Sequence, residues 1–545
     1  MTSYDAGTSE LPLIEETIGQ MLARTVARVP DSEAFVECET GRRWTYSELD
    51  AEVDQLARGL LDAGVAVGDR IGIWSPNCAE WVVLQYATAR IGAILVNINP
   101  AYRTHELVYA LNQSGCRILV SATEFKTSNY VAMVDEVRGD LDTVQSVVYI
   151  GSPEWDALVA RGDAVSPEAL AERAAQLTPN DAINIQYTSG TTGFPKGATL
   201  SHRNLVNNAF FIGEACGYSE IDRVCVPVPF YHCFGMVLGN LASATHGSCV
   251  VVPAPGFDAA LTMKAVAEEK CTSLYGVPTM FIAELALPDF SKYDVSTLRT
   301  GIMAGSPCPV EVMKRVVAEM NMTEVTIAYG MTETSPVSTQ TGADDDLERR
   351  VSTVGRVHPH VEIKIVNPET GETVPRGEAG EFCTRGYSVM LGYWNDQERT
   401  TEAIDPEGWM HTGDLATMDA EGYVKIVGRI KDMVIRGGEN VYPREIEEFL
   451  YTHPAIADVQ VIGVPDERYG EELCAWVVVR DGQSVTVEDV REFCTGKLAH
   501  FKIPRYVMVV EEFPMTVTGK IQKFKMREES IERLGLQAAA ATVTA

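Results

Sequence analysis

The sequence has no closely spaced cysteine pair, no long apolar run and few basic residues, and each absence excludes a class of protein. The 12 cysteines are scattered from Cys38 to Cys494 without a CxxC pair, which argues against a zinc ribbon or a disulfide scaffold. No stretch of about 18 apolar residues is present, so we expect no transmembrane helix. Lys and Arg total 45 against 76 Asp and Glu, a net charge of −31, and such a charge repels nucleic acid and anionic membrane surfaces.

The remaining composition is that of a folded protein in a reducing compartment. With 545 residues and 46% hydrophobic content, the chain can form several domain-sized units that need no metal or disulfide staple. The acidic N-terminal segment lacks the apolar core of a signal peptide, and the C-terminal residues match no peroxisomal or prenylation signal. We therefore expect a cytoplasmic protein. The oligomeric state is left open, with a homodimer as one option.

The first half of the chain alternates helix and strand patterns. Apolar residues recur at helical spacing over residues 45–61, and a short apolar strand follows at 70–74. A second helical pattern covers 79–91, and further apolar runs cover 93–98 and 117–122. This rhythm predicts an α/β fold with a largely parallel sheet.

The pattern of apolar and turn-forming residues changes in the last third of the chain. Short runs at 361–366, 380–386 and 422–428 are separated by Gly, Pro, Asp and Asn, which is typical of a smaller β-rich subdomain. Helices and strands then alternate compactly in an α+β pattern. We place a domain boundary near residues 428–432.

A glycine-rich segment, YTSGTTGFPKG at residues 187–197, follows the apolar strand INIQ. Glycines let backbone N–H groups approach an anion, while hydroxyls add donors and Lys196 adds charge. This is the chemistry of a phosphate cradle, although a Gly/Ser/Thr loop taken alone is more often a polar turn. It is not a Walker A loop, because Pro195 precedes the lysine and Gly197 follows it.

The full string resembles the phosphate-binding loop of the adenylate-forming superfamily, which includes acyl-CoA synthetases, nonribosomal adenylation domains and firefly-type luciferases. Four further motifs follow in the family's order: YGMTETSP (329–336), GWMHTGDLA (408–416), GRIKDMVIRGGENVYPREIE (428–447) and PMTVTGKIQK (514–523). The resemblance covers nearly the whole chain. It implies a large AMP-binding domain of α/β subdomains plus the β-rich subdomain (1–428), a hinge (429–431) and a small mobile α+β domain (432–545).

The resemblance also implies the roles of single residues in forming an acyl-adenylate from ATP, with Mg²⁺ as cofactor. Thr332 is expected at the α-phosphate, Glu333 at Mg²⁺, Asp414 at the ribose, and Lys520 between the carboxylate and the α-phosphate. Outside the motifs, each would more often be a cap, a turn residue or a solvated lysine. The other expected ATP contacts are Thr188, Ser189, Gly190, Thr191, Thr192, Gly193, Lys196, Gly305, Ser306, Pro307, Tyr329, Gly330 and Arg429.

The acid substrate is predicted from the segment PVPFYHCFGM. By resemblance His232 gates the carboxylate site, although a histidine among apolar residues is usually a core residue. Amino-acid-loading relatives usually carry an acidic residue just after this position, and none follows here. An uncompensated ammonium would be costly, so we expect a plain acid with an apolar tail. Its pocket would be lined by Met236, Val237, Gly276, Val277, Met303, Ala304 and Met331.

For the second half-reaction, the resemblance implies that CoA displaces AMP after the small domain rotates about Lys431. The expected CoA-tunnel loop is Arg436, Gly437, Gly438 and Glu439. Acyl-AMP ligases that load carrier proteins typically have an insertion between the TGD motif and the hinge, and here that segment is short.

We therefore predict an AMP-forming ligase that uses ATP, CoA and a medium-chain or broad range of fatty acids. The alternatives left open are a CoA ligase for an aryl acid or another carboxylic acid, an acyl-AMP ligase for a carrier protein, a luciferase-like oxygenase and a catalytically silent binding protein.

Overall fold

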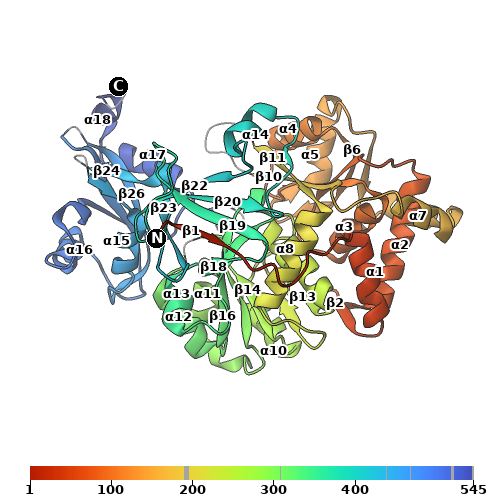
Figure 1. The fold of residues 1–545 in the computed structure, drawn as a ribbon, viewed down its shortest axis with the longest axis horizontal. Helices are drawn as coiled ribbons and strands as arrows, with labels where there is room; N and C mark the ends of the chain where they lie inside the picture. Colours follow the sequence, from red (N-terminus) through yellow and green to blue (C-terminus); the bar gives the residue numbers. More distant parts are fainter. Residues whose placement is uncertain (189–194, 307, 437–438, 467, 517–520, 543–545) are drawn as a thin grey trace.

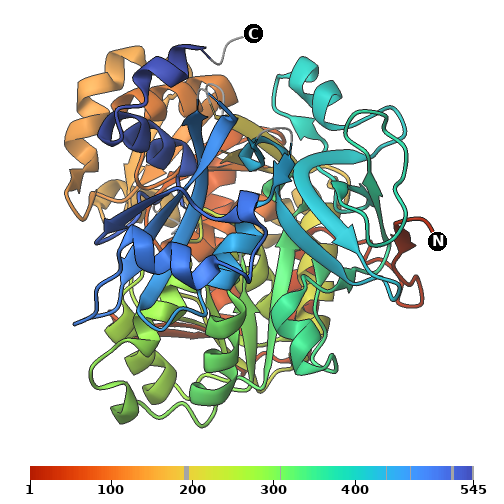
Figure 2. The ribbon, with the colours of Figure 1, turned by 90° about the vertical axis from the view of Figure 1, so that its left-hand side faces the viewer.

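The computed structural model describes residues 1–188, 195–306, 308–436, 439–466, 468–516 and 521–542. Two large sheets and a smaller β-rich subdomain form most of the molecule, and the C-terminal residues gather at one end (Figure 1). The predicted α/β fold with a large N-terminal and a small C-terminal part is confirmed. Seen from that end, the C-terminal part lies in front of the rest of the molecule (Figure 2).

The first large sheet confirms the predicted helix–strand rhythm. Strand β4 covers Arg70–Trp74 and helix α3 covers Ala79–Ile91, the two ranges that the apolar pattern predicts. Helix α2 (Tyr46–Asp62) begins one residue later than predicted, because Thr45 caps it through the N–H of Glu48. The order of the seven strands is β21 (Gly392–Tyr393), β11 (Lys196–Ser201), β10 (Ala182–Thr188), β5 (Ile94–Asn97), β4, β6 (Cys116–Ser121) and β9 (Ser146–Tyr149), with α4 (Thr104–Ser114), α5 (Tyr130–Val137), α6 (Pro153–Ala160) and α7 (Pro167–Ala174) connecting or covering them.

The second large sheet is mainly parallel, with antiparallel strands at its two ends. Its order is β18 (Arg356–Val357), β17 (Val337–Gln340), β16 (Glu324–Gly330), β15 (Thr300–Met303), β14 (Ser273–Gly276), β12 (Arg223–Cys225), β13 (Cys249–Val252), β2 (Glu33–Glu37) and β3 (Arg42–Thr45). The helices of this part are α1 (Ile18–Arg28), α8 (His202–Ala215), the π-helix η3 (Phe234–Leu241), α9 (Ala242–His246), α10 (Ala259–Glu268), α11 (Pro278–Leu285), α12 (Val310–Glu319), the 3₁₀ turn η5 (Thr332–Thr334) and α13 (Leu347–Ser352).

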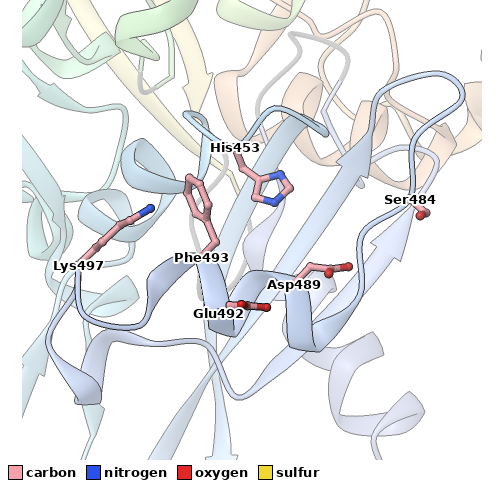
Figure 3. Close-up of a pocket in the computed structure, with 6 residues that line it drawn as sticks. All are labelled: His453, Ser484, Asp489, Glu492, Phe493 and Lys497. Carbon is pink, nitrogen blue, oxygen red and sulfur yellow. The ribbon is translucent and has the colours of Figure 1, made fainter.

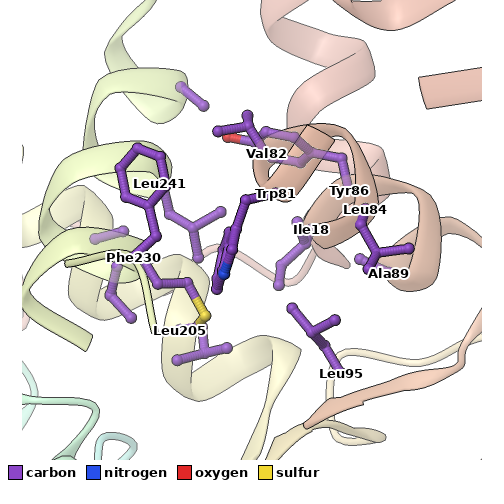
Figure 4. Packing of buried hydrophobic residues seen from close by; sticks show 14 of the residues in the cluster. Ile18, Trp81, Val82, Leu84, Tyr86, Ala89, Leu95, Leu205, Phe230 and Leu241 are labelled. Atoms are coloured by element: carbon purple, nitrogen blue, oxygen red, sulfur yellow. The ribbon is translucent and has the colours of Figure 1, made fainter. Parts of the chain in front are cut away.

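The main core packs helices of both parts against one another. Helix α3 has 12 of its 13 residues buried, which is the pattern of a helix covered on all sides. Trp81 of α3 packs against Phe230 with ring centroids 5.6 Å apart. Leu205 and Leu241 belong to the same buried cluster (Figure 4). The twelve cysteines all lie in described segments, and all are free thiols, as their scatter predicts.

The β-rich subdomain forms where the sequence texture changes, but it also recruits the N-terminus. Strand β1 (Tyr4–Ala6) pairs with β19, and no local sequence pattern predicts this pairing. The sheet order is β1, β19 (Val361–Val366), β20 (Gly380–Gly386), β22 (Met410–Met418) and β23 (Val424–Arg429), and α14 (Gln397–Ala403) lies between β21 and β22 in the chain.

The C-terminal part is a separate sheet covered by helices. After the short turn η6 (Ile430–Asp432), the chain leaves the β-rich sheet and enters this one. Its elements are β24 (Val434–Arg436), β25 (Glu439–Val441), α15 (Pro443–Leu450), β26 (Ile456–Asp466), β27 (Gly470–Val479), α16 (Val487–Cys494), β28 (Tyr506–Val510), α17 (Lys523–Arg533) and α18 (Gln537–Thr542). Among the residues described, no helix is long and apolar enough to cross a membrane.

Candidate active site

The predicted site residues of three separate segments meet at one edge of the second large sheet. Strands β14, β15 and β16 are parallel neighbours, with Gly276 opposite Met303 and Met303 opposite Ile327. The segments that follow their carboxyl ends therefore lie side by side. Val277 follows β14, Ala304 to Ser306 follow β15, and η5 with Thr332 and Glu333 follows β16.

Glu333 is the central carboxylate of this edge. It is 5% exposed, and its Oε1 accepts hydrogen bonds from the hydroxyls of Tyr393, at 2.8 Å, and Thr188, at 3.4 Å. Burial and the adjacent carboxylate raise the pKa of Tyr393, so its hydroxyl stays protonated and can donate. Both partners are hydroxyls, so the negative charge of Glu333 is stabilised without being neutralised by these two groups.

The glycine-rich segment lies between two antiparallel strands rather than between a strand and a helix. Thr188, the last residue of β10, faces Lys196, the first residue of β11, across the ladder. The Lys196 ammonium lies 4.8 Å from the centre of the Tyr393 ring. The Tyr187 hydroxyl, which the sequence groups with the cradle, instead donates to the carbonyl of Ala110 at 3.0 Å, because alternate residues of a strand face opposite sides.

A second carboxylate, Asp414, is positioned from the β-rich subdomain. It is 9% exposed, and its Oδ2 accepts a 2.8 Å hydrogen bond from the Tyr329 hydroxyl. Its Oδ1 lies 3.1 Å from Nε of Arg429, the residue opposite it in the β22–β23 ladder. Burial, followed by the Asp414 charge, raises the pKa of Tyr329. The structure thus brings together Tyr329, Asp414 and Arg429, three of the residues predicted to contact ATP.

His232 reaches the same edge through its neighbour. Its Nδ1 accepts the backbone N–H of Phe234 at 3.1 Å, which fixes the ring at the start of η3. The thiol of Cys233 lies 3.8 Å from both His232 Nδ1 and the Thr332 hydroxyl. Gly235 is required here, because a Cβ would collide with the Pro229 carbonyl. π-Helical turns such as η3 occur frequently at functional sites.

The pKa of Lys431 is shifted by charged groups of this site. Burial, followed by the positive charge of Arg429, lowers the pKa of Lys431, and Lys196 acts in the same direction. Asp414 and Asp432 oppose the shift. The predicted hinge residue is therefore electrostatically linked to both the nucleotide carboxylate and the phosphate-loop lysine.

Five of the seven predicted acyl-pocket residues belong to one apolar cluster. Met236, Val237, Val277 and Ala304 are buried in the main core, and Met331 packs against it. Gly276 is buried at the end of β14, whereas Gly330, one of the expected ATP contacts, is exposed at the end of β16. Met303 lies in a different cluster, because it and Ile302 face opposite sides of β15.

Arg436 of the small domain, a predicted CoA-tunnel residue, is paired with a glutamate. The Arg436 guanidinium forms an ion pair with Glu472, with Nη2 to Oε2 at 2.8 Å, and Glu472 is 1% exposed. Two nearby lysines are also paired, Lys502 with Glu445 at 2.7 Å and Lys523 with Glu447 at 2.6 Å. Glu439 begins β25. Arg436 thus forms an ion pair within its own domain, and its place in the CoA tunnel stays a prediction.

Several predicted residues lie outside the described segments. These are Ser189, Gly190, Thr191, Thr192, Gly193, Pro307, Gly437, Gly438 and Lys520. Gly305 and Ser306, which precede Pro307, lie in a turn where Gly305 adopts a φ of +87°, a conformation that favours glycine.

Tyr393 is the site residue that sequence reasoning missed. It follows Gly392 in β21, which joins β11 at the edge of the first sheet, and it stands between Lys196 and Glu333. A tyrosine in a short two-residue strand gives no local signal of function.

An open surface hollow lies elsewhere, on the small domain. It is lined by His453, Ser484, Asp489, Glu492, Phe493 and Lys497 (Figure 3), none of which belongs to the predicted site.

Two family models match this chain. The family described as AMP-binding enzyme matches residues 22–394, and the AMP-binding enzyme C-terminal domain matches residues 445–520. The chain is 46% identical over 555 residues to the medium-chain acyl-CoA ligase ACSF2, mitochondrial, of Danio rerio, covering 98% of this chain and 92% of that protein.

Two solved structures are similar over nearly the whole chain. The anthranilate CoA ligase AuaEII in complex with anthranoyl-AMP has a TM-score of 0.87 at 29% identity, covering 96% of this chain and 98% of that one. The fatty acyl CoA synthetase of Mycobacterium tuberculosis has a TM-score of 0.73 at 31% identity, covering 94% and 98%.

Proposed function

This chain belongs to the AMP-binding enzyme family, and we infer that it is an AMP-forming ligase that joins a medium-chain or broad range of fatty acids to CoA. One observation carries the inference. Glu333 and Asp414, two buried carboxylates from different subdomains, meet the sheet edge where the phosphate-loop residues Thr188 and Lys196 also lie. The same chain is 46% identical to a medium-chain acyl-CoA ligase.

The first half-reaction needs positioning and charge compensation rather than a base. A fatty acid is already ionised near neutral pH, so its oxygen can attack the α-phosphorus of ATP while the bond to pyrophosphate breaks. In this proposal Lys196 and Thr188 hold the outgoing phosphates, and Thr332, whose hydroxyl lies 3.8 Å from the Cys233 thiol, contacts the α-phosphate. Asp414 is held by Tyr329 and Arg429 in an orientation suited to accepting ribose hydroxyls.

Glu333 fits a role in holding Mg²⁺. Mg²⁺ prefers hard oxygen ligands and retains several waters, and Glu333 offers a carboxylate surrounded by the hydroxyl oxygens of Tyr393 and Thr188. When bound, the ion would supply positive charge to the phosphates. Tyr393 orients the Glu333 carboxylate from one side and packs under Lys196 on the other.

The surroundings of His232 favour an apolar acid. The eight residues of η3, Phe234 to Leu241, are all buried, and none is charged. A ring stack between Phe234 and Tyr275, with centroids 5.5 Å apart, continues the apolar surface. A buried ammonium would have no compensating charge in this segment, so amino acids are disfavoured and alkyl acids are favoured.

CoA is favoured as the acceptor by the compact β22–β23 hairpin. Asp414 pairs directly with Arg429, and the ladder continues to Met418 opposite Val424, so no inserted module separates the TGD motif from the hinge. In the second step the CoA sulfur attacks the acyl carbon, and the bond from that carbon to the AMP oxygen breaks. We propose that the small domain, 432–545, turns about Lys431 between the steps and that Lys520 serves the first.

The activity is tested by pyrophosphate release with ATP and Mg²⁺ against acetate, C6 to C16 fatty acids, benzoate, anthranilate and amino acids, with and without CoA. CoA-stimulated turnover that peaks in the fatty series supports the ligase and sets its chain length. CoA-independent exchange without turnover would contradict CoA as acceptor and favour a carrier protein.

An aryl acid is the second candidate, because the structure with a TM-score of 0.87 is an anthranilate CoA ligase. In the same panel, turnover with benzoate or anthranilate above every fatty acid would establish this alternative.

A further inference from the structure

Three metal-ligating side chains converge in the β-rich subdomain, outside the set assigned to the nucleotide. Cys383 of β20 and His411 of β22 face one another in the antiparallel ladder. The Cys383 sulfur lies 3.5 Å from His411 Nδ1, and Glu381 Oε2 lies 2.9 Å from the same nitrogen. One ligand atom from each residue lies within 4.8 Å of the others, so one ion could contact all three after small side-chain movements.

A fourth residue supports the imidazole from its other side. Asp405 Oδ2 lies 3.7 Å from His411 Nε2. Its Oδ1 is fixed by hydrogen bonds from the N–H groups of Glu407 and Trp409, at 2.8 and 2.9 Å. Histidines that bind metal through one ring nitrogen commonly present the other to a carboxylate, and Asp405 lies within ion-pair distance of that nitrogen, although beyond hydrogen-bond length.

We propose that Cys383, His411 and Glu381 form a binding site for a zinc-class divalent cation, with Asp405 as the positioning carboxylate. A thiolate, an imidazole and a carboxylate are the ligands that select Zn²⁺ over Mg²⁺ or Ca²⁺. The inference does not depend on the identity of the acid or of the acyl acceptor.

The three ligand residues differ in their exposure to solvent. The thiol is completely buried, whereas the His411 side chain is one-third exposed, so His411 gives the cation its route of entry.

The site is joined to the ribose carboxylate through the backbone. Glu381 Oε1 accepts the N–H of Gly413 at 3.0 Å, and the Thr412 hydroxyl donates to the carbonyl of Phe382 at 2.6 Å. Asp414 comes next in the chain. A cation bound by Glu381 and His411 would therefore tie β20 to the strand that carries Asp414.

The test is zinc content after chelator treatment, incubation of the full-length protein with ZnCl₂ and desalting. Wild type should retain about one equivalent, and Cys383→Ser and His411→Gln should each lose it. Asp405→Asn should retain the site with about 10- to 100-fold weaker affinity. Cys38→Ser removes a more exposed thiol and is the matched control, which should bind like wild type.

Two further measurements keep the proposal open to contradiction. Cobalt in place of zinc should give a thiolate charge-transfer absorption in wild type that is absent in Cys383→Ser, and unchanged far-ultraviolet circular dichroism shows that the variant is folded. Zinc should slow amide exchange at residues 411–414 in wild type alone. Equal zinc content in wild type and Cys383→Ser, or zinc loss in Cys38→Ser, would overturn the site, and unchanged exchange would overturn its link to Asp414.

Discussion

The proposed nucleotide edge of the large domain and the predicted CoA-tunnel loop of the small domain arrange their charges in opposite ways. At the nucleotide edge, Glu333 takes its hydrogen bonds from the hydroxyls of Tyr393 and Thr188, which leave its charge in place. In the small domain, Arg436 is neutralised by the buried Glu472. We infer that the charge of Glu333 is available to a ligand, whereas the charge of Arg436 stabilises the fold of the small domain through Glu472.

The largest effect is expected where the small domain contributes chemistry to the large one. Lys520→Ala should lower acyl-adenylate formation about a thousandfold, because one charge-stabilising donor to the reacting phosphate is lost. Thioester formation from supplied acyl-adenylate should be nearly unchanged. The two half-reactions are measured separately by pyrophosphate release and by CoA consumption.

Lys497→Ala is the matched control for this variant. Lys497 lies over the Phe493 ring, 4.3 Å from its centre, on the hollow-bearing side of the small domain, and its loss should change neither half-reaction. Equal loss of both half-reactions in Lys520→Ala would contradict the proposed rotation about Lys431.

Glu333→Gln should lower adenylate formation about a hundredfold and raise the Mg²⁺ concentration needed for half-maximal rate, because the charge at the phosphates is lost. The Mg²⁺ dependence of pyrophosphate release measures this. Glu284→Gln is the matched control, since Glu284 is also a buried carboxyl, at 1% exposure against 5% for Glu333, and burial raises its pKa. An unchanged Mg²⁺ requirement in Glu333→Gln would contradict the proposed metal role.

Tyr393→Phe sharpens the comparison by removing one hydroxyl from the Glu333 carboxylate. A hydrogen bond to a charged group contributes about 1.5–3 kcal/mol, so adenylate formation should fall about 10- to 100-fold while the ring under Lys196 is retained. Tyr109→Phe, which removes a hydroxyl that donates to the Pro195 carbonyl at 3.1 Å, should have a smaller effect. An equal loss in both variants would count against a specific role for Tyr393.

The smallest effect is expected at the contact between the domains. Arg444 pairs with Glu448 at 2.8 Å and donates to the Cys308 carbonyl of the large domain at 2.9 Å. Arg444→Ala should change the two half-reactions by less than about tenfold and in unequal proportion, because it removes one docking contact. Arg315→Ala removes a similar pair, with Glu319, between two solvent-exposed side chains of α12 and should change neither. Equal effects of the two variants would show that the docking contact is inert.

The sequence predicts the local part of this picture well. The predicted bounds of β4 and α3 agree with the observed ones. Both segments have many apolar residues, and their lengths are those of a buried strand and a helix. The ordered motifs also predict that Tyr329, Asp414 and Arg429 meet, although they lie far apart in the chain.

Long-range pairing is what the sequence could not predict. Strand β1 joins the β-rich sheet across more than 350 residues, and Tyr393 reaches Glu333 only because β21 pairs with β11. The commitment of Arg436 to Glu472 depends on the β24–β27 ladder. Such partners depend on strand register and topology, which a motif does not encode.

The most direct test of the central claim follows the carboxylate oxygen. Octanoate labelled with ¹⁸O at both oxygens is incubated with ATP, Mg²⁺, CoA and enzyme, and the AMP is analysed by mass spectrometry. Attack on the α-phosphorus followed by thiol attack on the acyl carbon predicts one ¹⁸O in each AMP formed. Unlabelled AMP, or label found in inorganic phosphate with ADP as the product, would contradict an acyl-adenylate intermediate.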